Sequence, residues 1–103
     1  MAHHYPHIDA MLAGEPLEFL VNLTDMQEHE RLNRRALEAG LHVWSEKPIA
    51  NTLAAGQELL ALALRRKLRL WSAPITAQSP QFAFMAQTLN RGALGRVAAA
   101  HAH

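Results

Sequence analysis

Hydrophobic and polar positions follow two different spacings along this 103-residue chain. Four segments have apolar residues three or four positions apart, as on one face of a helix, and the short apolar runs between them are typical of strands. The expected helices are 8–14, 26–39, 53–67 and 80–91, and the expected strands are 17–23, 41–45 and 68–72, with a weaker one at 96–103. Helices and strands that alternate over short connections predict parallel pairing.

Capping and turn residues stand at the ends of these segments. Asp25, with Glu28 three positions later, has the form of a capping box at a helix N-terminus. Thr52 is an expected N-cap, and Ser79 precedes a proline at the first helical position. Gly40 follows the second helix, where a left-handed residue ends many helices.

The apolar stripes predict which side of each helix is buried. The expected core positions are Leu32, Ala36 and Ala39 in the second helix, Leu53, Leu60 and Leu64 in the third, and Phe82, Met85, Ala86 and Leu89 in the fourth. Trp44 and Trp71 lie in strands and are expected to face helices. We therefore expect an α/β fold: a partial Rossmann-like three-layer sandwich of three parallel strands, with helices on both faces, about four helices in all and a C-terminal strand, forming one domain over residues 1–103.

Composition narrows the class of protein. The formal net charge is +1 and there is no cysteine, so neither strong polyanion binding nor disulfide chemistry is expected. The basic cluster 65–67 falls in the last turn of a helix, where cations complement the helix dipole, so no nucleic-acid partner is expected. No apolar run approaches the roughly 20 residues of a membrane span, and the N-terminus has no signal pattern. The expected location is cytoplasmic, with no membrane partner.

The tripeptide Glu46-Lys47-Pro48 is the strongest candidate for chemistry. It follows the strand 41–45 and precedes a helix, and ligands of open α/β sheets bind at the carboxyl ends of the strands. A lysine in a partly desolvated cleft can have its pKa lowered and take a proton, or can act as a fixed cation. The alternative is a surface Glu–Lys pair, which contributes little. Pro48 fixes the turn, and its peptide bond is a candidate for the cis form.

A second candidate loop is Thr24-Asp25, also between a strand end and a helix start. Backbone N–H groups and the helix dipole at such a place suit an oxygen-rich or anionic ligand. The alternative is that both residues only cap the helix. His101 and His103 share a face of the expected last strand, but no third ligand accompanies them, so no metal site is expected.

These residues, taken in order, resemble a known family. The set comprises Asn22-Leu23-Thr24-Asp25, His29, Ala39-Gly40, Glu46-Lys47-Pro48, Ala50-Asn51-Thr52 and the segment Arg91 to Val97. It resembles the Gfo/Idh/MocA family of nicotinamide-dependent sugar and polyol oxidoreductases, from about residue 8 to the C-terminus. The resemblance covers the later half of the nucleotide-binding Rossmann domain of such an enzyme.

The resemblance implies roles for individual residues. Lys47 would lie beside both the nicotinamide and the substrate, as the catalytic residue, and also contact the cofactor. Thr24 would line the nicotinamide ribose, Glu46 would hold the ribose or orient Lys47, and Pro48 would shape the turn. His29 would support the Thr24 loop without transferring protons. Asp25 replaces the proline or asparagine that is usual in the family. Its carboxylate would repel a nearby phosphate.

The resemblance also shows what this chain lacks. No Gly-rich G-x-G-x-x-G turn occurs in the sequence, although NAD or NADP is the cofactor expected from the family. The first hypothesis is a segment of an NAD(P)-dependent oxidoreductase acting on a sugar, inositol or related polyol; the 103-residue chain alone is expected to be inactive. The second is a catalytically silent α/β module for self-association or partner binding. A truncated product, a remnant and an excised segment all remain open, as do the substrate and the choice between NAD and NADP.

The strand 18–23 would lie at an open edge of the expected sheet. It is apolar and contains neither Lys nor Pro, and such an edge is a template for pairing with another chain. A homo-oligomer is therefore expected, with this strand, the segment 96–103 or both at the interface.

Overall fold

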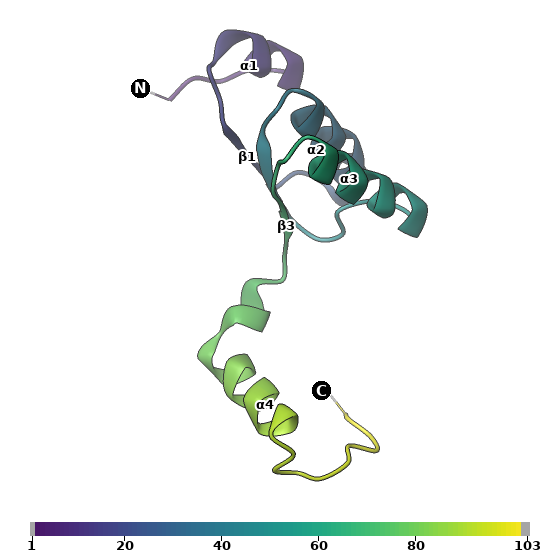
Figure 1. Cartoon of the computed structure of the whole chain (residues 1–103). Helices are drawn as coiled ribbons and strands as arrows, with labels where there is room; N and C mark the ends of the chain where they lie inside the picture. The colour runs from purple at the N-terminus through teal and green to yellow at the C-terminus, as the bar shows by residue number, and fades with distance from the viewer. Residues whose placement is uncertain (1, 102–103) are drawn as a thin grey trace. The chain divides into compact units, whose positions relative to one another are not determined.

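The computed structural model describes residues 2–101, apart from the side chains of residues 75 and 77. The chain divides into two compact units, Met1–Ala73 and Pro74–His103. The first unit holds the sheet and both candidate loops (Figure 1).

The sheet has three strands in the order β1 (Phe19–Asn22), β2 (His42–Ser45) and β3 (Leu70–Ser72). Both pairings are parallel, so the predicted strands and their direction are confirmed. The register pairs Asn22 with Ser45 and Ser45 with Ser72, which brings the carboxyl ends of all three strands to one edge.

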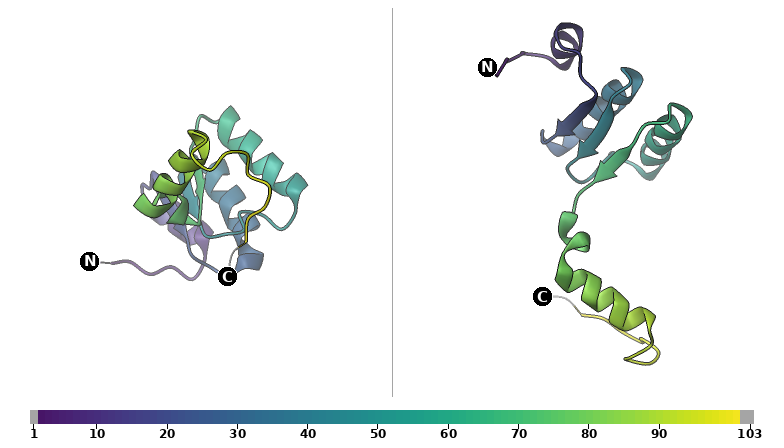
Figure 2. Two further views of the ribbon diagram at one scale, coloured as in Figure 1. Left: turned by 90° about the horizontal axis from the view of Figure 1, so that it is seen from below. Right: turned by 60° about the vertical axis from the view of Figure 1, so that its left-hand side comes forward.

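The helices of the first unit are α1 (Ile8–Gly14), α2 (His29–Glu38) and α3 (Leu53–Arg65), with a short 3-10 helix η1 (Met26–Glu28) before α2. Both α2 and α3 lie on the same face of the sheet, side by side (Figures 1 and 2). This differs from the expected helices on both faces. Right-handed crossovers that move steadily from β1 to β2 to β3 put every crossover helix on one side.

The hydrophobic core lies between that face and the two helices. It contains Ala36, Leu37, Leu41, Val43, Leu59 and Ala63. On the opposite side of the sheet, which we call the open face, lie Phe19, Val21, His42, Trp44 and Trp71. Phe19, Val21 and Trp71 are 45%, 51% and 45% exposed, and the Phe19 and Trp71 rings lie 5.8 Å apart. The expectation that Trp44 and Trp71 face helices was therefore wrong.

The expected core stripes of α2 and α3 were wrong in part. In α2 the buried residues are His29, Asn33, Ala36 and Leu37, whereas Ala39 is exposed. In α3 the buried residues are Leu59 and Ala63, whereas Leu53, Leu60 and Leu64 are 80%, 48% and 78% exposed. The helix α3 is leucine-rich on more than one side, so its sequence contains two apolar stripes, and contact with the sheet selected the other one.

Two of the three expected N-caps formed as predicted. Thr52 Oγ1 accepts a hydrogen bond from the Ala55 N–H at 3.1 Å. Asp25 makes no side-chain capping bond, and Glu28 accepts from Arg31 instead of completing a capping box. The cause is η1, a tighter turn that places the start of α2 at His29.

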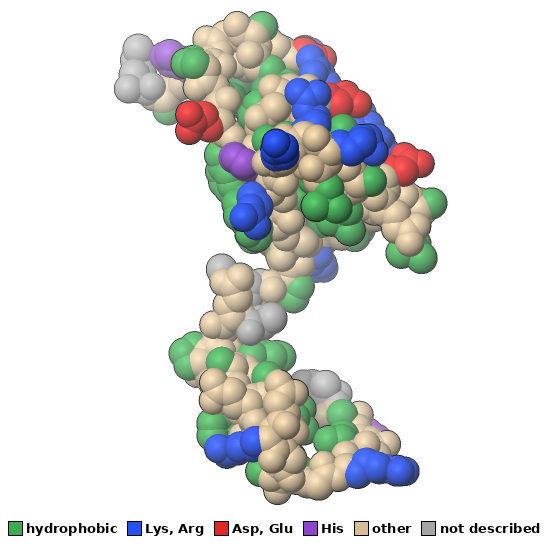
Figure 3. Space-filling view, in the orientation of Figure 1, with side chains coloured by type: hydrophobic (Ala, Val, Ile, Leu, Met, Phe, Trp, Pro, Cys, Tyr) green, Lys and Arg blue, Asp and Glu red, His purple; other side chains and the backbone are tan. Residues whose placement is uncertain are grey.

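Ion pairs join the helices of the first unit across their exposed sides. Arg34 donates to Glu58 of α3 at 2.9 Å, and Arg35 donates to Asp9 of α1 at 2.6 Å. Basic and acidic side chains are interspersed on this part of the surface in Figure 3. Exposed pairs of this kind contribute little stability, so the packing of the core carries most of it.

The second unit contains η2 (Ile75–Gln78) and α4 (Pro80–Asn90). Ser79 caps α4 by accepting from the Phe82 N–H at 3.3 Å, as predicted. The expected core positions Phe82, Met85, Ala86 and Leu89 are exposed. The strand expected at 96–103 does not form over residues 96–101, because the described part of the second unit holds no strand for it to pair with; residues 102 and 103 lie outside that part. Within the described residues, no helix is both long and apolar enough to cross a membrane.

Candidate functional site

His29 joins the two candidate loops. It is the first residue of α2 and is only 2% exposed. Its Nε2 lies 2.9 Å from the Thr24 carbonyl oxygen, and its Nδ1 lies 2.8 Å from the Pro48 carbonyl oxygen. One imidazole ring therefore spans the turn after β1 and the turn after β2.

A network of buried polar side chains also connects the same two loops. Asn22 Nδ2 donates to Asn33 Oδ1 at 2.8 Å, and Asn33 Nδ2 donates to Ser45 Oγ at 2.9 Å and to the Ile49 carbonyl at 3.0 Å. Ser45 Oγ in turn donates to the Glu46 carbonyl at 2.8 Å. Among the residues that the structure describes, no buried side-chain N or O atom lacks a partner. The network therefore meets the requirement that buried polar groups be paired.

The prediction of site residues from sequence missed Asn22, Asn33 and Ser45 as a group. Asn33 stands four residues after His29, so both lie on the same side of α2. Asn22 and Ser45 are the last residues of their strands and point toward the helices, as Val43 does. Two asparagines at inward positions of a strand and a helix are unusual in a core, and that was the available signal.

Thr24 is exposed, but its backbone is fully engaged. Its N–H donates to Asn22 Oδ1 at 3.3 Å, its hydroxyl donates to the same oxygen at 2.7 Å, and its carbonyl contacts His29. The Thr24 N–H, one of the backbone groups expected to suit an oxygen-rich or anionic ligand, is thus bonded within the protein. Asp25 is exposed beside it.

The Glu46-Lys47-Pro48 turn lies at the carboxyl end of β2, as expected. The Glu46 N–H donates to the Asn22 carbonyl at 2.9 Å, and Glu46 Oε2 accepts from the Lys47 N–H at 3.1 Å. The Lys47–Pro48 peptide bond is cis. The Lys47 side chain is exposed, so the described residues do not enclose it as a desolvated cleft would.

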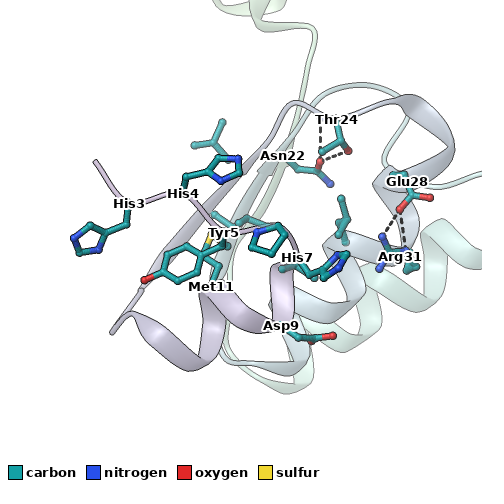
Figure 4. A pocket seen from close by; sticks show the side chains of 15 residues that line it. His3, His4, Tyr5, His7, Asp9, Met11, Asn22, Thr24, Glu28 and Arg31 are labelled. Atoms are coloured by element: carbon teal, nitrogen blue, oxygen red, sulfur yellow. Dashed lines mark hydrogen bonds and ion pairs between the residues drawn. The ribbon is translucent and has the colours of Figure 1, made fainter. Parts of the chain in front are cut away.

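A cavity of about 530 Å³ opens beside Thr24 (Figure 4). Thr24, Asn22, Glu28 and Arg31 line one part of it, and the N-terminal segment with His3, His4, Tyr5 and His7 lines another. Tyr5 Oη donates to Glu15 at 2.7 Å and holds this segment in place.

The hydrogen-bond partners of Glu15 shift its pKa and that of Tyr5. Hydrogen bonds from His3 and Tyr5 lower the pKa of Glu15, and the bond to Glu15 raises the pKa of Tyr5. Within residues 2–101, no group of three or more His, Asp or Glu side chains is arranged to hold a metal ion. The polar lining of the cavity consists of two hydroxyls, one amide, three imidazoles, the Asp9 carboxylate and one Glu–Arg pair, and apolar side chains line the rest.

A parallel α/β sheet with polar loops gathered at its carboxyl edge defines the class of Rossmann-type ligand-binding domains. The chain belongs to the Gfo/Idh/MocA oxidoreductase family, which has an NAD-binding Rossmann fold, because residues 1–73 match that family's sequence profile. The matched stretch coincides with the first structural unit.

Individual relatives agree with this assignment. The chain is 30% identical over 101 residues to the uncharacterized oxidoreductase YhhX of Escherichia coli, covering 98% of this chain and 29% of YhhX. The fold is similar to that of the WlbA dehydrogenase of Bordetella pertussis, solved with NADH and UDP-GlcNAcA (TM-score 0.85, 24% identity, 92% of this chain and 28% of WlbA). It is also similar to myo-inositol 2-dehydrogenase of Lactobacillus plantarum (TM-score 0.80, 17% identity, 90% and 28%). The chain thus spans less than a third of the length of these proteins.

Proposed function

We propose that the first unit forms the nicotinamide and substrate end of an NAD(P)-dependent oxidoreductase acting on a sugar, inositol or related polyol. The observation that carries this proposal is the His29 bridge, because it holds Thr24 and Glu46-Lys47-Pro48 at one edge of the sheet. Family membership supports the reaction type, and the names of WlbA and of myo-inositol 2-dehydrogenase support the substrate class.

The residues present fit one end of the cofactor better than the other. The Thr24 hydroxyl and the Glu46 carboxylate suit the hydroxyl groups of a ribose. A diphosphate needs several free N–H groups, usually those of a Gly-rich turn. That turn does not occur in the sequence, and the Thr24 N–H is already bonded to Asn22. We therefore assign to this unit the ribose and nicotinamide side only, which NAD and NADP have in common.

Lys47 carries the chemistry in this proposal. The bound nicotinamide supplies the hydride acceptor. As the hydride leaves the substrate carbon, the neutral amine of Lys47 would take the hydroxyl proton, and the ammonium so formed would stabilise the negative charge on that oxygen. Glu46 fixes the Lys47 backbone through the 3.1 Å hydrogen bond from the Lys47 N–H. His29 acts on Lys47 only through the turn, by holding the Pro48 carbonyl.

The proposal is tested in a complete enzyme. Residues 8–73 replace the matching stretch of the myo-inositol 2-dehydrogenase, and NADH formation from myo-inositol is followed by absorbance. We expect Lys47→Ala to lower kcat by roughly 10²- to 10⁴-fold, the range for loss of a positioned acid–base group, with a small change in KM.

The matched control is Lys67→Ala. Lys67 is the other lysine of the chain, is exposed, and lies at the opposite, amino-terminal end of β3. It should leave kcat within about twofold, because a surface change away from the site has little effect. A Lys47→Ala enzyme that keeps its turnover and shows only a raised KM would make Lys47 a binding residue.

One observation favours the second candidate function, a self-association or partner-binding module. The open face exposes about half of Phe19, Val21 and Trp71. Exposed apolar patches of this kind often mark interaction surfaces. The open face and the carboxyl edge of the sheet adjoin, because Val21 of the open face also lines the cavity beside Thr24.

A further inference from the structure

The side-chain amide of Asn33 has one orientation, fixed by its partners. Asn33 is fully buried, and its Nδ2 lies 3.0 Å from the Ile49 carbonyl oxygen and 2.9 Å from Ser45 Oγ. A carbonyl oxygen only accepts hydrogen bonds, so the NH₂ end of Asn33 must face Ile49. The Asn33 oxygen therefore faces Asn22 and accepts from its Nδ2 at 2.8 Å.

The orientation of Asn22 is fixed independently from the other end. The backbone N–H of Thr24 can only donate, and it lies 3.3 Å from the side-chain oxygen of Asn22. The Nδ2 of Asn22 also lies 3.4 Å from the His29 carbonyl, which again needs a donor. Both ends of the network thus require the same direction of donation, from Thr24 to Asn22 to Asn33 to Ile49.

We call this directed chain of hydrogen bonds the relay. We propose that the relay leaves the Thr24 hydroxyl able to accept a hydrogen bond from a ligand but not to donate one. The hydroxyl hydrogen is donated inward to Asn22 Oδ1 at 2.7 Å, the Thr24 N–H is used by the same oxygen, and the Thr24 carbonyl is held by His29. Only lone pairs of Thr24 Oγ1 remain for the cavity, where Figure 4 shows the Asn22–Thr24 pair at the lining.

A ligand group at Thr24 must therefore be a hydrogen-bond donor, such as a sugar hydroxyl or an amide NH₂. An acceptor-only anion would meet lone pairs at Thr24 and the carboxylate of exposed Asp25 next to it. The choice of ligand rests on the proposed function, in which Thr24 lines the ligand. Asn22 and Asn33 are positioning residues, since they act on the ligand only through Thr24.

The direction of the relay can be measured in the 103-residue chain without a ligand. Cross-hydrogen-bond NMR couplings connect a donor nitrogen to the carbon of its acceptor. We expect a coupling from Asn22 Nδ2 to Asn33 Cγ and another from Asn33 Nδ2 to the Ile49 carbonyl carbon. A coupling from Asn33 Nδ2 to Asn22 Cγ would reverse the relay and overturn the proposal.

The pH dependence of the folding stability of Asn22→Asp gives a second readout. Its sign differs between the two possible directions of the relay. With the relay as proposed, one carboxyl oxygen of the variant faces two acceptors, Asn33 Oδ1 and the His29 carbonyl, so the acid must be protonated to donate there. The Thr24 N–H and hydroxyl still donate to the other oxygen, but burial of this position also disfavours the charged form and outweighs them. The folded pKa is then raised above the unfolded value of about 3.9, and stability is highest below that value and falls as pH rises. At neutral pH we expect the unfolding constant to rise roughly 10- to 100-fold over wild type, with recovery on acidification.

The reversed relay predicts the opposite profile. An NH₂ group of Asn33 would then donate to the carboxylate of the Asn22→Asp variant, which would be stable at neutral pH and weaken on acidification. That result, or the absence of both forward couplings together with no pH dependence beyond that of the wild type, overturns the proposal. Wild-type unfolding at each pH is subtracted as the background.

The ligand polarity is tested with sulfate, an acceptor-only anion. Sulfate is titrated against the Thr24 amide cross-peak, with sodium chloride at matched ionic strength as the control. We expect no saturable shift at Thr24, and a saturable shift would overturn the proposal. None of these readouts uses NAD or turnover, so they can fail while the oxidoreductase assignment holds, and the reverse is also true.

Discussion

At the scale of single residues, His29 links two loops that are distant in sequence. Its two contacts reach across 5 residues to Thr24 and 19 residues to Pro48. The family resemblance predicted a supporting role at the Thr24 loop, but not the contact with Pro48. That contact depends on β1 and β2 lying side by side, which a local pattern does not encode.

We expect His29→Ala to destabilise the first unit by about 2–4 kcal/mol. The change removes the ring that contacts two carbonyl oxygens, leaves at least one of them without a donor, and opens a cavity where a buried side chain stood. Urea unfolding measures the effect. His4→Ala is the matched control, because His4 is exposed and should change stability by less than about 0.5 kcal/mol. Equal, small effects of both variants would contradict the bridging role.

At the scale of elements, α3 shows where a hydrophobic pattern is ambiguous. Its leucines occur on more than one side, and the stripe predicted to be buried is the exposed one. The cap at Thr52 was predicted correctly, because it depends only on residues within the same turn. Helix ends are thus determined locally, whereas the buried side of an all-apolar helix is chosen by the surface that it meets.

Two leucines of α3 allow a direct test of which side of this helix is buried. Leu59 is fully buried and Leu64 is 78% exposed on the same helix. We expect Leu59→Ala to lower the free energy of unfolding by about 2–5 kcal/mol, the usual cost of a cavity in a core. Leu64→Ala should change it by less than about 0.5 kcal/mol, since alanine also favours helix. A larger loss for Leu64→Ala would mean that the stripe 53, 60 and 64 is covered in solution.

At the scale of the whole molecule, the 103-residue sequence has a candidate ligand-binding edge but no Gly-rich phosphate turn. We expect it to bind NADH and NADPH weakly or not at all, and to show no turnover, because diphosphate capture normally rests on that turn. Calorimetric titration measures this. A dissociation constant on the order of micromolar would contradict the prediction and would require a phosphate site elsewhere.

The sheet also predicts self-association. β1 stands at one end of the strand order, and its Val21 side chain is 51% exposed on the open face. Unpaired edges and exposed apolar faces both favour pairing with another copy. We expect light scattering to show a dimer or larger species, and Val21→Lys to shift it toward monomer, because a charge on an edge strand disfavours pairing. A wild-type monomer at tens of micromolar would contradict this prediction.

The sequence by itself determined the order of helices and strands as far as α4, the parallel pairing, the caps at Thr52 and Ser79, and the place of Glu46-Lys47-Pro48 at a strand end. These features depend on spacing and turn chemistry over a few residues, which a single chain displays directly. The capping box at Asp25 failed even so, because η1 competed with it over the same residues.

The tertiary structure alone decided which face of the sheet stays open, which leucines of α3 form the core, and which polar side chains meet. Asn22 and Asn33 are 11 residues apart, and Asn33 is 16 from Ile49. Their hydrogen bonds arise only after α2 packs on β1 and β2. The direction of the relay, and with it the acceptor character of Thr24, is a property of that packing, because each buried amide must satisfy its donors and acceptors at once.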